Sequence, residues 1–411
     1  MLNVGESYSI TETPGRNSYF VNWTGTALMP IGATTNPTLD FIMENTTSIT
    51  ANFITNMFVG MAGTYNGLFS SEALGVPTEE TAGLIGNLIL KTNGTFTATL
   101  NLAGAAPGIS GGFNPAGYWS NVVGKVKVEL TVNAMSAPRT ITASVTPTNS
   151  ILVNGVSQPP WTSEGTLFAS LAYPHVNAGA YTLLIPPATA NALGAPLATP
   201  PGYGYALLTN TAGTAAVLPS VTITGMLADG TTISQNVGIG EDNGIPVFPS
   251  PFTSTTNGLL FGRINLSSTP TFPGPTGDLT WIRKASATGL FKAGFTNPAV
   301  AVQGSPWLNS VLFLLNAQLV LSNYATPTPL PPIYVSVVNK TNLVPVATSP
   351  YYTSGSINTN TGQLTITFTN YGVRVTGRGA FLQEAGFGGG LFVMPPASAS
   401  PTNAGSISLQ P

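Results

Sequence analysis

Short runs of alternating apolar and polar residues, separated by glycine turns, recur along most of this chain. The clearest run is 364–369 (LTITFT), and 126–132 and 221–224 show the same period of two. Because successive side chains of a β-strand point to opposite faces, such runs bury one face and expose the other. Turn dipeptides that supply the positive φ of tight hairpins stand at Asn66-Gly67, Asn93-Gly94, Asn154-Gly155, Asp229-Gly230 and Asn257-Gly258. The pattern predicts an all-β fold.

Proline clusters suggest where this β-rich chain divides. Pro186-Pro187 and Pro200-Pro201 flank an alanine-rich loop, and another proline-rich stretch covers 326–332. We expect a small N-terminal β-module at 1–54, a large β-barrel or β-sandwich at 55–290 and a smaller C-terminal β domain at 291–411. Trp281 is expected in the last strand of the large domain.

The first 54 residues carry an aromatic pattern of their own. An early tyrosine strand is followed by F-V-N-W-T-G at 20–25 and by T-A-N-F at 50–53. This resembles the small bacterial β-repeat that occurs in tandem on large surface and secreted proteins, and the resemblance implies a stalk role without catalytic residues. A domain this small without disulfides needs a dense core. Its expected members are Tyr8, Phe20, Trp23, Phe41 and Phe53.

The segment 62–69 (AGTYNGLF) opens a second resemblance. Three later blocks, 83–117, 202–237 and 355–383, each read as strand, glycine turn, strand and glycine turn. Together they resemble the β-rich domain at the carboxyl end of long bacterial extracellular proteins. Because the blocks share a pattern and not close identity, we expect weak internal repetition.

Scarcity of charge excludes several classes of function. The chain has 12 Lys and Arg, 14 Asp and Glu, one His and no Cys, and charged residues make up 6% of it. About a quarter is usual. Nucleic-acid binding needs a basic face, and disulfides, thiol chemistry and Cys-based zinc sites need cysteine. Strands faced with hydroxyls and amides in place of Lys and Glu are typical of secreted β-proteins, so we expect an extracellular or cell-surface location.

Few residues offer catalytic chemistry. His175 follows a proline in a predicted loop, and a general base would need a nucleophile and an orienting acid nearby. Glu79-Glu80 and Glu241-Asp242 are the only adjacent acid pairs. Adjacent residues of a strand face opposite ways, and in a loop a solvated turn explains both pairs. We therefore expect no enzymatic activity and no catalytic residues.

One loop could hold calcium. Glu241, Asp242 and Asn243 place two carboxylates and an amide before Gly244, and Ca²⁺ binds oxygen ligands. The D-x-[DN]-x-[DN]-G loop is absent, and turn formation is the competing interpretation. This is the sole metal or cofactor prediction.

Aromatic side chains could instead stack on a sugar. The candidates are Tyr118-Trp119, Trp161, Tyr203, Tyr205, Trp307 and Tyr351-Tyr352. Alternation along a strand turns one residue of each adjacent pair inward, so we expect most of them in the core.

No segment predicts a membrane span. The longest apolar run, 311–321, is about half the ~20 residues that a spanning helix needs and contains Asn316 and Gln318. We expect a buried pair of strands there. Residues 1–6 lack the pattern of a signal peptide, so we expect that the sequence begins inside a longer precursor.

Two functional hypotheses remain. The first is a non-enzymatic structural or adhesive surface protein that self-assembles into a homopolymer, filament or layer, because charge that opposes edge pairing is nearly absent. The alternative is a carbohydrate-binding module or carbohydrate-active enzyme with a glycan partner. A concave site with exposed aromatics and an acid favours the alternative, and closed barrels with apolar outer patches favour the first.

Overall fold

The fold is all-β, as the alternation predicts. The only helices among the described residues are a 3-10 turn, η1 (Thr26–Leu28), and α1 (Phe58–Met61). The computed structural model describes the whole chain except residues 1, 16, 29–31, 72–74, 135, 154–155, 173–178, 188–197, 250–257, 267–273, 287–289, 309–315, 324–329, 340, 371 and 395–403.

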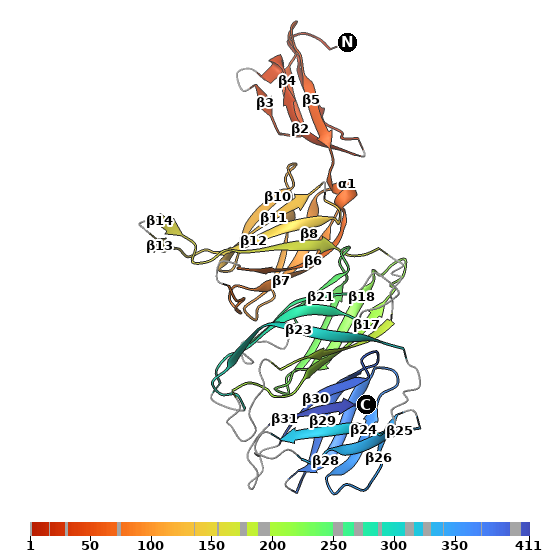
Figure 1. Cartoon of the computed structure of the whole chain (residues 1–411). Helices are drawn as coiled ribbons and strands as arrows, with labels where there is room; N and C mark the ends of the chain where they lie inside the picture. Colours follow the sequence, from red (N-terminus) through yellow and green to blue (C-terminus); the bar gives the residue numbers. More distant parts are fainter. Residues whose placement is uncertain are drawn as a thin grey trace.

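Four β units follow one another along the molecule (Figure 1). An N-terminal module lies at one end, and three eight-stranded sheets are stacked below it. We call these sheets the first barrel (63–169), the second barrel (179–307) and the third barrel (317–410).

The N-terminal module is built from two small antiparallel sheets, β1-β4 and β3-β2-β5. Its strands are β1 (Ser7–Thr11), β2 (Ser18–Thr24), β3 (Ala33–Thr34), β4 (Thr38–Ile42) and β5 (Thr50–Thr55). Phe20, Trp23 and Phe41 are buried as predicted, and Tyr8 packs beside them. The core prediction is wrong for Phe53, whose side chain is 42% exposed because β5 is an edge strand. Its ring still forms a T-shaped contact with Phe20, with centroids 5.7 Å apart.

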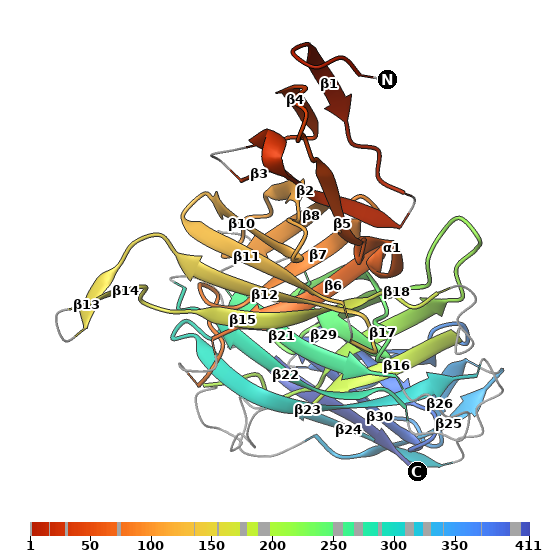
Figure 2. The same ribbon diagram turned by 90° about the horizontal axis from the view of Figure 1, so that it is seen from above.

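The first barrel is a meander whose last strand returns to the first. Its strands are β6 (Gly63–Ser70), β7 (Gly83–Leu90), β8 (Thr95–Leu102), β9 (Gly108–Gly112), β10 (Tyr118–Val123), β11 (Val126–Asn133), β12 (Thr140–Pro147) and β15 (Ser163–Ala169). β15 pairs with β6, and β9 and β10 are the two edges of the sheet. The hairpin of β13 (Ile151–Val153) and β14 (Val156–Gln158) projects away from the barrel (Figure 2).

The indole of Trp119 lies over the seam between β9 and β10. A Cβ added to Gly111 would lie 2.1 Å from Trp119 Nε1, so only glycine fits beneath the ring. The Trp119 ring also packs edge-on against Phe96 with centroids 4.9 Å apart. Side-chain packing therefore fills this seam where no backbone ladder pairs the two edges.

The second and third barrels repeat the connectivity of the first. In the second barrel β16 pairs with β23, and the edges are β19 and β20; in the third, β24 pairs with β31 and the barrel is closed. The second has β16 (Gly179–Ile185), β17 (Gly204–Thr211), β18 (Ser220–Met226), β19 (Thr232–Gly238), β20 (Gly244–Val247), β21 (Gly258–Asn265), β22 (Thr276–Arg283) and β23 (Phe295–Trp307). The third has β24 (Ala317–Asn323), β25 (Ile333–Val338), β26 (Asn342–Pro345), β27 (Tyr352–Ile357), β28 (Gln363–Asn370), β29 (Val373–Leu382), β30 (Phe387–Val393) and β31 (Ala404–Gln410).

The repeated sequence blocks correspond to hairpins of these barrels. Blocks 83–117 and 202–237 contain the second to fourth strands of the first and second barrels, whereas 355–383 begins in the fourth strand of the third barrel and ends after the sixth. The first two blocks are thus equivalent in topology, and the third is out of phase with them.

The sheets divide the chain differently from the sequence prediction. Residues 55–290 contain the first barrel and seven strands of the second, and β23 beyond residue 290 completes that sheet by pairing with β16 and β22. Trp281 therefore lies in the next-to-last strand. The proline pairs at 186–187 and 200–201 begin and end the connection from β16 to β17, so they mark a loop within a barrel and not a domain boundary.

Two local predictions can be compared with the structure. Asn66-Gly67 is not a turn but part of β6, where the register shifts; a Cβ on Gly67 would lie 2.3 Å from the Thr166 carbonyl oxygen. Residues 317–321 of the predicted strand pair lie in β24, and 311–315 lie outside the described residues.

Candidate functional site

The loop predicted to bind calcium lies where the second barrel meets the first. It connects β19 to β20, and its backbone continues the end of β15: Ser170 forms a β-bridge with Gly240, and the Glu241 amide donates to the Ala169 carbonyl at 2.7 Å. The Leu171 amide donates to the Ile239 carbonyl at 2.8 Å on the other side of the bridge. The chain therefore leaves the first barrel already hydrogen-bonded to the second.

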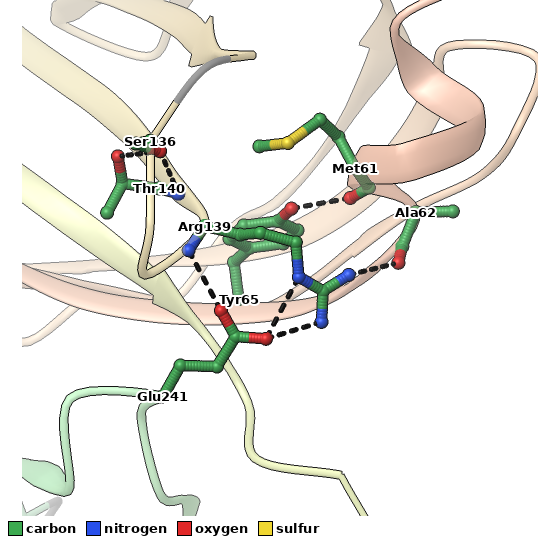
Figure 3. A network of polar contacts seen from close by, with 7 residues as sticks. All are labelled: Met61, Ala62, Tyr65, Ser136, Arg139, Thr140 and Glu241. Atoms are coloured by element: carbon green, nitrogen blue, oxygen red, sulfur yellow. Dashed lines mark hydrogen bonds and ion pairs between the residues drawn. The ribbon is translucent and has the colours of Figure 1, made fainter.

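Arg139 holds the carboxylate of Glu241 in this joint (Figure 3). Its Nε and Nη2 donate to Glu241 Oε1 at 2.9 and 2.6 Å, and its backbone amide donates to Oε2 at 2.8 Å. Nη1 donates to the Ala62 carbonyl at 3.0 Å. Hydrogen bonding to Glu241 raises the pKa of Arg139 above its ordinary value. The guanidinium thus joins the start of β6, the start of β12 and the second barrel at one point.

Tyr65 is buried next to this network. Its hydroxyl donates to the Met61 carbonyl at the end of α1, at 2.5 Å, and its side chain is fully buried. Burial disfavours the charged phenolate and raises the pKa of Tyr65 to about 12, although the nearby Arg139 acts in the opposite direction.

Asp242 is paired with a second arginine. It forms an ion pair with Arg263 of β21, whose guanidinium carbon lies 4.3 Å from the centre of the Phe168 ring in the first barrel. Asp242 Oδ1 accepts the Gly244 amide at 3.1 Å, and Asn243 adopts a left-handed φ of 62° that closes the turn. Each of the two carboxylates predicted to bind calcium thus has an arginine partner.

The two residues of the other acid pair, Glu79 and Glu80, lie in different environments. Glu79 is buried and its Oε2 lies 2.5 Å from Lys284 Nζ, in an ion pair between the first and second barrels, whereas Glu80 is exposed. Among the described residues, no three His, Cys, Asp or Glu side chains gather as a metal site would require. His175 lies outside the described residues.

The joint between the second and third barrels combines apolar packing with neutral hydrogen bonds. Ala380, Leu382 and Leu391 of the third barrel belong to the hydrophobic core of the second. Close approach depends on glycine: a Cβ at Gly389 would lie 2.8 Å from Leu184 Cδ1. Thr182 Oγ1 also donates to the Phe381 carbonyl at 2.8 Å. Ion pairs and a backbone bridge therefore hold the first joint, whereas packing and neutral hydrogen bonds hold the second.

The N-terminal module contacts the first barrel through α1. The Tyr19 ring lies 6.3 Å from the Phe58 ring, which is 6.1 Å from Phe113 inside the barrel. Asn56 Nδ2 donates to the Thr92 carbonyl at 2.9 Å. Aromatic packing and a hydrogen bond thus fix this third joint.

The aromatic candidates divide as the alternation predicts. Tyr118 and Tyr351 are exposed, whereas Trp119 and Tyr352 pack against the cores of their barrels. Burial of Tyr352 raises the pKa of its phenol. The remaining candidates are buried or half-buried, namely Trp161, Tyr203, Tyr205 and Trp307.

Tyr351 lines a groove on the third barrel that sequence reasoning did not predict. The groove has a volume of about 440 Å³, and Tyr334 of β25 shares it. The sequence held a signal for Tyr334, because it lies between the inward-facing Ile333 and Val335 and must face outward. The lining consists of Asn316, Pro331, Pro332, Ile333, Tyr334, Val346, Ala347, Thr348, Ser349, Pro350 and Tyr351.

Comparisons with protein-family models, curated proteins and solved structures returned no match. Within the part of the chain that the structure describes, no helix is long and apolar enough to cross a membrane.

Proposed function

We propose that this chain is a non-enzymatic extracellular structural or adhesive protein whose barrels form one rigid stack. The observation that carries the proposal is the Arg139–Glu241 ion pair. It connects two barrels in a chain in which only 6% of the residues are charged. A second ion pair, Lys284–Glu79, crosses the same joint. Domains that must move independently share small, polar and loosely held interfaces. Here the first joint has a backbone bridge and ion pairs, and the second has a shared hydrophobic core.

The resemblance of residues 1–54 to a bacterial stalk repeat fits this proposal. The module adds one more unit to the line of barrels, and its contact through α1 continues the stack (Figure 1). A stalk holds a binding surface at a distance, and its own requirement is stiffness. The extracellular location belongs to the same proposal and rests on the low charge and the hydroxyl-faced strands.

Self-assembly into a filament or layer is the further part of the proposal. β9 and β10 are sheet edges, as are β19 and β20, and in each seam side chains stand where a backbone ladder would otherwise join the two edges. The backbone groups that remain without a ladder partner can pair with a strand from another molecule. Natural edge strands commonly carry charge that prevents this pairing. No charged residue lies in any of these four strands.

A carbohydrate-active enzyme is less well supported. Glycoside hydrolysis commonly requires two carboxylates beside the sugar, and no described residue that lines the Tyr334–Tyr351 groove is acidic. Of the acid pairs considered, Glu241 and Asp242 are both engaged by arginines and Glu79 is paired with Lys284.

Small-angle X-ray scattering tests the rigid stack. We expect the wild-type chain to show the maximum dimension of the extended arrangement in Figure 1, with no sign of flexibility between barrels. Arg139→Ala should add flexibility at the first joint. The matched control is Lys127→Ala. It removes an exposed ion pair with Glu129, a residue of the same strand, so it crosses no joint and should leave the scattering unchanged. Scattering from a flexible wild-type chain would contradict the proposal.

A further inference from the structure

The groove on the third barrel has the form of a small binding site. It lies beside the start of β25 and the segment that joins β26 to β27. Its volume of about 440 Å³ falls within the roughly 300–1,000 Å³ of typical ligand sites. The third barrel is also the unit farthest from the N-terminal module in the stack (Figure 1), so the groove is well placed for adhesion.

Two tyrosines are presented in the groove by a fixed backbone. Tyr334 is 47% and Tyr351 is 37% exposed. The Tyr334 carbonyl accepts the Val346 amide at 2.8 Å, and the Tyr351 carbonyl accepts the Thr369 amide at 2.7 Å. Neither phenolic hydroxyl has a hydrogen-bond partner among the described residues. The groove therefore offers large, amphipathic rings whose polar ends are not engaged by the residues that the structure describes.

The lining selects against a charged ligand. None of the described residues of the groove is charged, and its polar side chains are amide and hydroxyl groups such as Asn316 and Ser349. A carboxylate, phosphate or ammonium placed there would lose water without gaining an opposite charge. A neutral molecule rich in hydroxyl groups suffers no such cost, because hydroxyls pair with amides and with tyrosine.

We propose that this groove binds a neutral glycan, with sugar rings stacked by their C–H faces on Tyr334 and Tyr351. Sugar hydroxyls would pair with the phenols and with Asn316. This inference rests on the adhesive part of the proposed function and names its ligand. A proline-rich peptide is the main competitor, since aromatic grooves also bind polyproline helices. The glycan is favoured because the hydroxyls of Thr348 and Ser349 accept as well as donate hydrogen bonds, and sugar hydroxyls supply the donors that a polyproline helix lacks.

Affinity electrophoresis of the full chain provides the test. The probes are four neutral polysaccharides (hydroxyethyl cellulose, xyloglucan, galactomannan and dextran), anionic alginate and poly-L-proline. We expect at least one neutral polysaccharide to retard the wild type, and alginate to have no effect. Tyr334→Ala and Tyr351→Ala should each weaken binding about tenfold, the loss expected for one aromatic stacking contact.

Two further variants separate a binding role from a structural one. Tyr334→Phe keeps the ring and should bind within about threefold of wild type, since it loses one exposed hydrogen bond. Tyr118→Ala removes an equally exposed tyrosine from the first barrel and should bind as wild type does. Thermal unfolding of each variant verifies that the third barrel is folded.

Several results would overturn the assignment. They are no retardation by any neutral polysaccharide, binding that survives both alanine substitutions, and retardation by poly-L-proline alone. Self-association of the wild type that both alanine variants abolish would also overturn it, because the face would then contact a second copy. The scattering test of the rigid stack is independent of these results, so either proposal can fail while the other stands.

Discussion

Arg139 of the first barrel donates three hydrogen bonds to the carboxylate of Glu241, which lies 102 residues later in the second barrel. Their side chains are 32% and 23% exposed, so the pair is partly shielded from water. Partial burial strengthens a charged hydrogen bond and makes the loss of one partner costly. The pair therefore couples the two barrels together with the backbone bridge and the Lys284–Glu79 ion pair.

Removing this arginine should loosen the joint before it unfolds either barrel. We expect Arg139→Ala to cost about 2 kcal/mol in the free energy of opening the joint, because Glu241 loses the two hydrogen bonds from the guanidinium and keeps only the one from the backbone amide of residue 139. Hydrogen exchange measures this as faster exchange at the Leu171 and Glu241 amides, with β11 unchanged. Lys127→Ala serves as the control and should leave both amides protected. Unchanged exchange at these amides in Arg139→Ala would show that the ion pair does not hold the joint.

Tyr65 should make the stability of the first barrel fall at alkaline pH. Its folded pKa is about 12, above the ordinary value of 10.0, so the folded state holds the proton more tightly. Below pH ~10 this preference is fully present, and it is lost as pH rises from there through about 12. Chemical denaturation across this range should give a shallower decline for Tyr65→Phe than for wild type. Unfolding of the third barrel should keep its own alkaline slope in both proteins, since burial there raises the pKa of Tyr352. Identical slopes would contradict the assignment.

Gly389 should tolerate no side chain, because the second and third barrels touch there. An added Cβ would lie 2.8 Å from Leu184 and 3.0 Å from the Tyr203 ring. We expect Gly389→Ala to destabilise the two barrels by roughly 1–3 kcal/mol through overpacking, measured by calorimetry. Gly108→Ala is the control, since an added Cβ meets no atom within 4 Å there. Equal melting temperatures for the two variants would argue against close contact at this joint.

Association between molecules should resist salt. Low charge and uncharged sheet edges imply contacts that are apolar and hydrogen-bonded, and salt screens neither strongly. Light scattering at increasing protein concentration should therefore show assembly in both low and high salt. A chain that stays monomeric at high concentration in both conditions would refute self-assembly and leave a monomeric stalk or adhesin.

The local sequence pattern was enough to predict the strands and to predict which residue of an adjacent aromatic pair faces the core. The alternation of 364–369 places it in β28, and the same rule turns Trp119 inward and leaves Tyr118 exposed. These features depend on the period of a strand, which any short window of sequence contains.

Contacts between distant segments could not be read from the sequence. Glu241 resembled a calcium ligand because nothing local shows that Arg139 would reach it. Asn66-Gly67 resembled a hairpin turn, although Gly67 is there for close approach to the Thr166 backbone. The boundary at residue 290 failed to separate the barrels because β23 returns to pair with β16, a pairing set by topology alone.

The rigidity of the whole stack is tested most directly by one distance distribution. Because the chain has no native cysteine, spin labels can be placed at Val122→Cys in the first barrel and Val338→Cys in the third, both at exposed positions. Double electron–electron resonance should give a single narrow distribution that Arg139→Ala broadens. A broad distribution in the otherwise wild-type chain would show that the barrels move independently, and would contradict the proposal that this chain is a rigid stack.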